Sequence, residues 1–177
     1  MKKLSKLDMY KEKNPLAVVL IALFNKNKIL LAKRKREPYK GFFGILGGRQ
    51  TFGMLTKDIV KKEVLEEIGF SVKEGSIETR GLYSEILLDK DENPKDHFIF
   101  RVCEAHIDNK LTDELEKTDV EMFEWFDLPL KEEIKSKVIP TDLIMLEHIL
   151  SSSRYDFKEF VMQETEDPNE LKIVSIK

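Results

Sequence analysis

The segment GRQTFGMLTKDIVKKEVLEEIGF, residues 48–70, determines the fold more than any other part of the chain. Its second half has the apolar spacing of a helix, with Val60 and Val64 on one stripe. The helix is expected to begin near Thr56, and Gly69 stands where a glycine commonly ends a helix. The segment therefore predicts a loop followed by a helix that is buried along one side.

Three glutamates lie close together on this predicted helix. At about 100° per residue, Glu63, Glu66 and Glu67 fall within an arc of about 100°. Carboxylate oxygens are the ligands that Mg²⁺ prefers, and the bound ion can activate a water molecule beside a phosphate. A solvated acidic face balanced by neighbouring lysines is the competing interpretation of the same pattern.

Two glycines, Gly47 and Gly48, precede the helix by a short loop. Glycine lets the backbone approach a ligand or an ion closely, because it has no Cβ. A tight turn would need the same residues, so both interpretations stay open.

Strands and a second helix are expected around this segment. The helix should run from Pro140 to about Leu150, and a turn signal at 167–170 favours a hairpin in the tail. Strands are predicted at 17–24, 29–35, 41–46, 77–89, 97–107, 122–126, 157–163 and 171–176. This order indicates an α+β layered domain, because sheet faces and helix stripes must bury each other.

The 177 residues suit a single domain, 1–177, with a core at about 16–150 and extensions at 1–15 and 151–177. The formal net charge of −3 gives no reason to expect nucleic-acid or anionic-membrane binding. The single cysteine, Cys103, excludes an internal disulfide and a cysteine-based zinc site. Any phosphate recognition must therefore come from a local cluster of residues.

The two ends of the chain carry weaker signals. The basic first 15 residues lack the apolar stretch of a signal peptide, and no run approaches the ~20 apolar residues of a membrane span. We therefore expect a cytoplasmic protein. The tail could pack on the core, or it could mediate a homodimer.

Residues 48–70 resemble the Nudix box, which is a glycine, five residues, a glutamate, seven residues, then R-E-U-x-E-E-x-G-U with U a bulky aliphatic residue. The residues that match at the required spacing are Gly48, Glu63, Val64, Glu66, Glu67 and Gly69. The resemblance implies an α/β/α sandwich with a mixed sheet between helices. It also implies Mg²⁺ or Mn²⁺ held by Glu63, Glu66 and Glu67, with help from the Gly47 carbonyl. Family members use an activated water to hydrolyse a diphosphate bond in a nucleoside diphosphate derivative, such as a nucleoside triphosphate or a nucleotide sugar.

Two positions depart from the family pattern. Met54 replaces the first glutamate of the box, and Lys62 replaces its arginine, so a pair of polar residues has changed together. Lysine is a more flexible point charge that could reach solvent or Glu66, one turn away. We expect activity to survive, and a weakened nucleotide-binding or regulatory domain is the alternative. A DNA-binding regulator is disfavoured, because the 27 residues after Leu150 look β-like.

Substrate-binding candidates surround the box. On the predicted strand Arg34 and Arg36 point to one face and Lys33 and Lys35 to the other, so one of these pairs could contact phosphates, and a solvated strand end is the alternative. Phe43 could stack on a base or fill the core. Gly47, Gly48 and Lys62 complete the expected set of substrate-binding residues.

A general base outside the box is implied by the resemblance, but its position varies within the family. Glu121 and Glu124, just before Trp125, are the candidates, and Glu121 is the preferred one. Both could equally be ordinary surface acids.

Overall fold

The computed structural model describes residues 14–72, 74–107, 121–152 and 154–177. Its strands are β1 (Leu16–Asn25), β2 (Lys28–Arg34), β3 (Phe43–Gly44), β4 (Leu46–Arg49), β5 (Glu78–Leu88), β6 (Pro94–Ile107), β7 (Glu121–Asp127), β8 (Asp156–Glu164) and β9 (Leu171–Ile176). The helices are α2 (Thr56–Ile68), the 3₁₀ turn η1 (Glu74–Ser76), α3 (Glu132–Lys135) and α4 (Pro140–Ser151). Within these residues the strands form one sheet in the order β3-β2-β1-β6-β5-β8-β9, with β4 also on β1 and β7 on β2.

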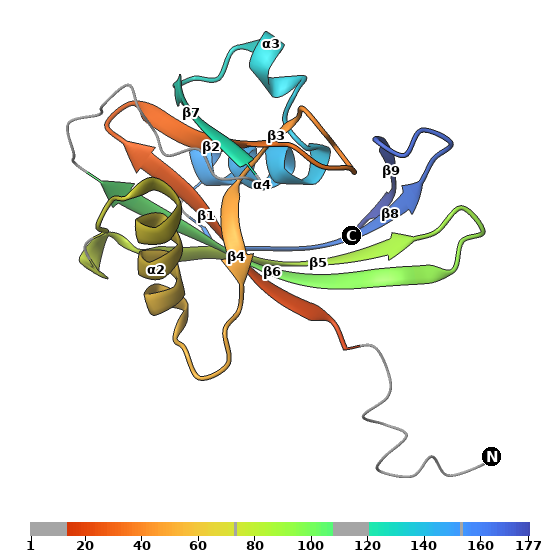
Figure 1. Cartoon of the computed structure of the whole chain (residues 1–177), viewed down its shortest axis with the longest axis horizontal. Helices are drawn as coiled ribbons and strands as arrows, with labels where there is room; N and C mark the ends of the chain where they lie inside the picture. The colour runs from red at the N-terminus through yellow and green to blue at the C-terminus, as the bar shows by residue number, and fades with distance from the viewer. Residues whose placement is uncertain (1–13, 73, 108–120, 153) are drawn as a thin grey trace.

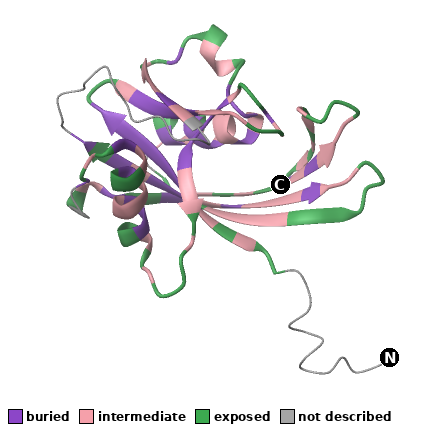
Figure 2. Ribbon diagram, viewed as in Figure 1, coloured by how far each residue is buried: buried purple, intermediate pink, exposed green. Residues whose placement is uncertain are grey.

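Strand β1 lies at the centre of the sheet and is covered on both faces. Val19 and Ile21 pack with the buried side of α2, whereas Leu20 and Ala22 pack with α4. A strand buried on both faces needs a continuous apolar run instead of alternation, which is what its sequence has. Figures 1 and 2 show α2 and α4 on opposite sides of the buried strands. The predicted α+β sandwich is confirmed.

The sheet is mixed, because β1 pairs parallel to β6 and β5 pairs parallel to β8, whereas the other pairs are antiparallel. Strand β1 also changes its partner on one edge. Residues 18–21 pair with β4, and residues 23–25 pair with β2. The sheet therefore divides beside β1, and Gly47 and Gly48 lie inside β4 instead of following a strand that ends at Leu46.

Helix α2 begins at Thr56 and ends at Ile68, as its pattern predicts. Gly69 adopts the left-handed conformation with φ 72°, and its N–H donates to the Leu65 carbonyl. Leu55 holds the cap position at the start of the helix and offers no side-chain hydrogen bond. The Thr56 hydroxyl accepts a hydrogen bond from Arg101 on β6, which ties the helix start to the sheet.

The tail extends the sheet. Strand β8 pairs parallel to β5 from Gly81 to Leu88, and β9 pairs antiparallel to β8. The hairpin therefore packs on the core, and its turn reaches back to the loop that follows β2 (Figure 1). Among the described residues no helix is long and apolar enough to cross a membrane.

A buried arginine joins the end of α4 to the sheet. Arg80 on β5 is 6% exposed and pairs with Glu104 on β6. Its other guanidinium nitrogen donates to the carbonyls of Ser152 and Ile149, at the end of α4. A cation there satisfies carbonyls that a helix end leaves without partners and complements the helix dipole.

Replacing this cation should destabilise the fold strongly. Arg80→Met leaves the Glu104 charge and the carbonyls of α4 partly buried without their donor, so we expect the free energy of unfolding to fall by about 3–5 kcal/mol. Urea denaturation measures the loss. The double variant Arg80→Met/Glu104→Met should recover part of it, and strictly additive losses would contradict the ion-pair account.

Candidate active site

The Glu63 carboxylate lies directly against β4. A Cβ built on Gly48 would overlap with the carboxylate carbon and both oxygens of Glu63. Only 12% of the Glu63 side chain is exposed. Gly48 therefore has to be glycine for this side chain to lie where it does, and the helix and the two-glycine strand form one site.

Lys62 lies between two of the glutamates. Its Nζ is 3.1 Å from Oε1 of Glu63 and 3.0 Å from Oε2 of Glu66. The hydrogen bonds that Lys62 donates to Glu66 and then to Glu63 raise its pKa above the ordinary value. The Glu66 side chain is 59% exposed. One ammonium group, that of Lys62, therefore pairs with both the largely buried Glu63 and the exposed Glu66.

Met54, the second departure from the family pattern, packs against the core cluster that includes the buried side of α2. Its side chain therefore makes an apolar contact at the position where the pattern has an acid. Glu67 is half-buried, and its Oε2 is shielded from solvent. Within residues 14–72, 74–107, 121–152 and 154–177, no three acidic, histidine or cysteine side chains converge closely enough to hold a metal ion.

The carbonyl of Gly47 points away from β1. The N–H of Gln50 donates to the Ala17 carbonyl, and antiparallel pairing alternates between bonded and outward residues. Gly48 therefore bonds toward β1, whereas the N–H and C=O of Gly47 lie on the outer edge of β4. This is the edge at which the sheet divides.

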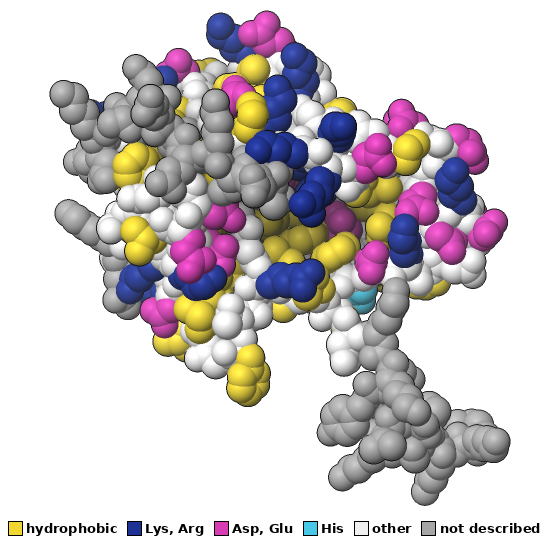
Figure 3. Space-filling view, viewed as in Figure 1, with side chains coloured by type: hydrophobic (Ala, Val, Ile, Leu, Met, Phe, Trp, Pro, Cys, Tyr) yellow, Lys and Arg dark blue, Asp and Glu magenta, His cyan; other side chains and the backbone are white. Residues whose placement is uncertain are grey.

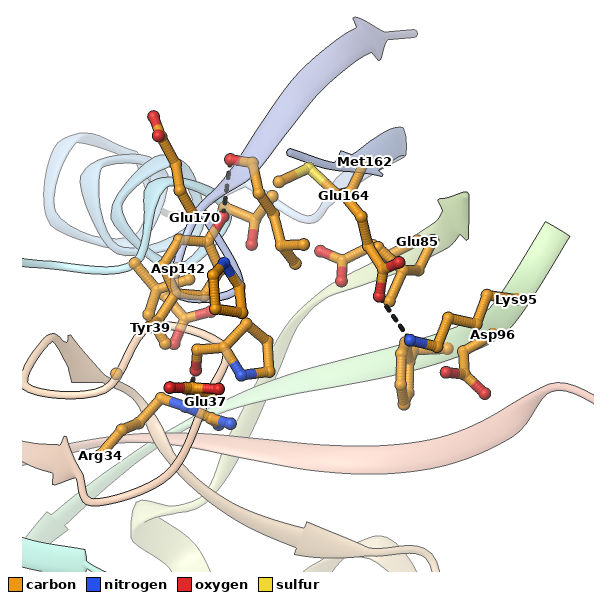
Figure 4. A pocket seen from close by; sticks show the side chains of 18 of the residues that line it. Arg34, Glu37, Tyr39, Glu85, Lys95, Asp96, Asp142, Met162, Glu164 and Glu170 are labelled. Carbon is orange, nitrogen blue, oxygen red and sulfur yellow. Dashed lines mark hydrogen bonds and ion pairs between the residues drawn. The ribbon is translucent and has the colours of Figure 1, made fainter. Parts of the chain in front are cut away.

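A cavity of about 830 Å³ opens on the opposite face of β4 from Glu63. Its lining includes Gly47 and Leu20 at one side and the hairpin residues Met162 and Glu164 at another. Figure 4 shows Arg34, Tyr39, Asp142 and Glu85 directed toward this space from four different elements. The volume lies within the ~300–1,000 Å³ range of small-molecule sites.

Of the predicted substrate-binding residues Arg34, Arg36 and Phe43, the lining of the cavity includes Arg34 alone. Arg34 lines the cavity, and its Nε donates to the Pro38 carbonyl at 2.9 Å. Arg36 lies beyond the end of β2, is exposed and is not part of the lining, so the expected alternation with Arg34 does not apply. Phe43 is 5% exposed and packs edge-on against Phe126, so its ring fills the core and does not face the cavity.

The two candidates for the general base, Glu121 and Glu124, lie on β7. Glu121 pairs through its backbone with Arg34, and its side chain lies outside the described residues. Glu124 is half-buried opposite Leu31 and does not line the cavity. Both therefore stay sequence-based predictions.

Two carboxylates that line the cavity, Glu85 and Asp142, were not predicted from the sequence. Glu85 comes from the middle of β5 and Asp142 from the first turn of α4, with Asp142 also accepting the Ile45 N–H at 2.8 Å. Burial, and then the charge of Asp142, raise the pKa of Glu85 to about 7, although a hydrogen bond with Thr141 opposes this. Neither acid belongs to a local motif, so no sequence signal marks them.

Comparison with known proteins decides the family. The NUDIX domain matches residues 13–146, which is most of the chain. The chain belongs to the Nudix family. The resemblance inferred from residues 48–70 is thereby confirmed.

Other Nudix proteins resemble the chain in part. An ADP-ribose pyrophosphatase from Methanocaldococcus jannaschii is 40% identical over 73 residues, which is 41% of this chain and 40% of that protein. The chain thus matches well under half of that relative. A MutT protein from Bacillus halodurans superposes with a TM-score of 0.69 at 21% identity, covering 92% of this chain and 96% of that one.

The Nudix domain of Shewanella oneidensis NrtR, solved with ADP-ribose, superposes with a TM-score of 0.62 at 17% identity. It covers 80% of this chain and 90% of the NrtR domain. At these identities the two structures show a shared fold.

The contact between Gly48 and Glu63 can be tested directly. Gly48→Ala puts a methyl group in the place of the Glu63 carboxylate, which is the end of a flexible side chain and can move aside, so we expect a small loss of about 1 kcal/mol in unfolding free energy. Gly75→Ala is the control, because nothing lies within 4 Å of its Cβ position. The double variant Gly48→Ala/Glu63→Ala should regain stability, and failure to regain any would contradict the overlap.

Glu85 makes stability depend on pH. Its pKa is about 7 in the folded protein against 4.5 ordinarily, so the folded state holds a proton that the unfolded state has lost. Stability therefore falls as pH rises from about 4.5 to 7, by on the order of 3 kcal/mol. Glu85→Gln should remove this fall, so its stability relative to wild type improves from pH 4.5 to pH 8.

Urea titrations at four or five pH values measure this difference. Glu159→Gln, on an exposed residue of β8 that does not line the cavity, is the control and should show a constant difference from wild type. An equal drift in both variants would rule out Glu85 as the source.

Proposed function

We propose that this protein is a hydrolase that cleaves a diphosphate bond in a nucleoside diphosphate derivative by means of an activated water. The observation that carries the proposal is the packing of the Glu63 carboxylate on Gly48. It puts the acidic face of α2 beside the two-glycine strand, whose neighbouring residue Gly47 lines a cavity of about 830 Å³. The shared fold and the family membership agree with this assignment.

The chemistry of the donors suits a divalent metal, Mg²⁺ or Mn²⁺, although among the described residues the acidic side chains do not converge on one point and Lys62 lies between Glu63 and Glu66. Glu63, Glu66 and Glu67 offer hard carboxylate oxygens from consecutive turns of one helix, and Gly47 offers a carbonyl on an open strand edge. Such an ion, when bound, neutralises phosphate charge and lowers the pKa of a water molecule. These four residues are the ones that would hold it.

The other residues of the site would bind and orient the substrate. Arg34 can donate two parallel hydrogen bonds to a phosphate from the cavity wall. Lys62 holds Glu63 and Glu66 in place, and its ammonium would have to shift when a cation approaches these carboxylates. The apolar floor of the cavity, which includes Leu20 and Phe100, would keep water away from the bound nucleotide.

A second candidate is a nucleotide-binding Nudix domain without turnover. The observation that favours it is the double ion pair of Lys62, which supplies a cation where the family pattern expects a metal. Binding of nucleotides without metal-dependent product release would support this alternative.

Turnover can be tested on a panel of nucleoside diphosphate derivatives and triphosphates. ADP-ribose is the first choice, because the archaeal relative is an ADP-ribose pyrophosphatase and the NrtR domain was solved with this compound. With Mg²⁺ present we expect release of a nucleoside monophosphate. Glu67→Gln should lower kcat by at least about 100-fold, because it removes a charged ligand and leaves the fold intact.

The control variant is Glu78→Gln, which changes an exposed acid of β5 outside the cavity and should keep wild-type kcat. Equal turnover by Glu67→Gln and wild type would refute the role of α2. No turnover on any substrate would favour the binding-only candidate.

A further inference from the structure

The C-terminal hairpin lies beyond the matched Nudix domain, yet it builds part of the cavity. The family match ends at residue 146, whereas β8 and β9 span residues 156–176. Met162, Glu164 and Leu171 from these strands line the space together with the turn between them. One wall of the cavity is therefore supplied by a segment outside the matched domain.

The turn of this hairpin is fixed to the loop after β2. The Tyr39 N–H donates to the Asn169 carbonyl at 3.1 Å, and Nδ2 of Asn169 donates to the Lys40 carbonyl at 3.1 Å. The Tyr39 hydroxyl also donates to the Leu171 carbonyl at 3.2 Å. These bonds close the cavity on the side of the hairpin, so its shape depends on the tail.

The cavity lining includes an aromatic pair. Phe98 and Phe100 line the cavity from β6, and their rings stack at 5.7 Å with an interplanar angle of 10°. Both side chains are half-buried, so part of each ring faces the cavity. A nucleobase can stack on such a surface, and the volume of about 830 Å³ exceeds what one nucleoside needs.

Charge is distributed unevenly around the cavity. Among the described residues of the lining, eight are acidic and three are basic. Two of the three cations are already paired, Lys95 with Glu164 and Lys90 with Glu166, which leaves Arg34 as the cation of this lining assigned to the diphosphate and none for an additional phosphate. In Figure 3 dark-blue side chains border the yellow hollow, whereas magenta ones gather over the lobe that contains β8 and β9.

This negative lining opposes another anion. Burial and the neighbouring Asp142 raise the pKa of Glu85, so even one of the cavity's own carboxylates is hard to ionise. A phosphate pressed against Glu85, Asp142 and Glu170 would meet the same opposition. The hydroxyl and amine donors of an uncharged nucleoside would instead find carboxylate acceptors.

We propose that the hairpin makes this cavity a subsite for an uncharged nucleoside and excludes a nucleoside that carries an additional phosphate, with Glu85 and Glu170 as specificity-determining residues. The inference rests on the proposed function for the direction of the diphosphate, which would extend from the cavity past Gly47 toward α2. It adds a substrate class: nucleotides with a free ribose 2′-hydroxyl are accepted, and their 2′-phosphorylated counterparts are rejected.

Calorimetric titration of the full-length protein with AMP and with adenosine 2′,5′-bisphosphate tests the subsite without requiring hydrolysis. At low salt we expect AMP to bind at least about tenfold more tightly, because like charges brought together cost several kcal/mol. The ratio should shrink as NaCl is raised, since the exclusion is electrostatic. Equal affinities, or no binding of either compound, would overturn the proposal.

A charge-matched pair of variants locates the effect. At pH 8, where Glu85 has lost its proton, Glu85→Gln/Glu170→Gln should reduce the affinity ratio at least about threefold, whereas Glu78→Gln/Glu159→Gln removes the same charge outside the lining and should leave it unchanged. An equal change in both would show a general effect of net charge and would overturn the assignment. If the ratio behaves as expected but no diphosphate is hydrolysed, the proposed hydrolase activity fails and the subsite stands.

A separate variant tests whether the hairpin contributes to AMP binding. Asn169→Ala removes the two side-chain hydrogen bonds between the turn and the backbone of Lys40 and should weaken AMP binding, whereas Lys172→Ala on the exposed side of β9 should not. AMP affinity that is unchanged in Asn169→Ala would exclude the tail from the subsite.

Discussion

Strand β1 is the constraint on which the other parts of the molecule depend. Both of its faces are buried, one against α2 and the other against α4, and its partner on one edge changes from β4 to β2. A strand with two buried faces must be apolar throughout, so it can carry no catalytic side chain of its own. The candidate site residues therefore lie on the elements that pack or pair with β1, namely α2 and β4. Strand β4 places Gly47 on the cavity side and Gly48 under Glu63, and the alternation of a strand separates these two roles.

The changes at positions 54 and 62 are easier to understand together than apart. In the family pattern a glutamate and an arginine often pair at these positions, but here Met54 packs into the core beside α2. A lysine without that partner turns to Glu63 and Glu66, which lie within 3.1 Å of its Nζ. The local site consequently carries one acid fewer than the pattern, and Glu63 and Glu66 share Lys62 as an internal counter-ion. A cation that enters must compete with an ammonium group already in place, which distinguishes this site from one that is simply acidic.

Local chemistry determined what could be predicted from the sequence. Helix α2, its glycine end and the common orientation of its glutamates follow from periodicity within 13 residues, and the structure shows the helix at those bounds. The roles expected for Arg36 and Phe43 depended on where a strand ends and which way a ring points. Strand β2 stops at Arg34, and Phe43 meets Phe126 from a distant strand, so neither outcome was visible locally. Glu85 and Asp142 are 57 residues apart in sequence and meet only because β5 and α4 flank one cavity.

The carboxylates of α2 and those of the cavity have different surroundings, so they suit different ligands. The carboxylates of α2 lie on a half-exposed helix face, where a cation can enter with part of its hydration shell. Those of the cavity are enclosed by Phe98, Phe100 and the hairpin, where burial already favours protonation of Glu85. On the proposed function and subsite, a substrate with an anionic middle and an uncharged end would therefore bind in one direction, with its phosphates toward β4 and α2 and its nucleoside toward the hairpin. The tail would then orient the proposed substrate without contributing a residue to the chemical step.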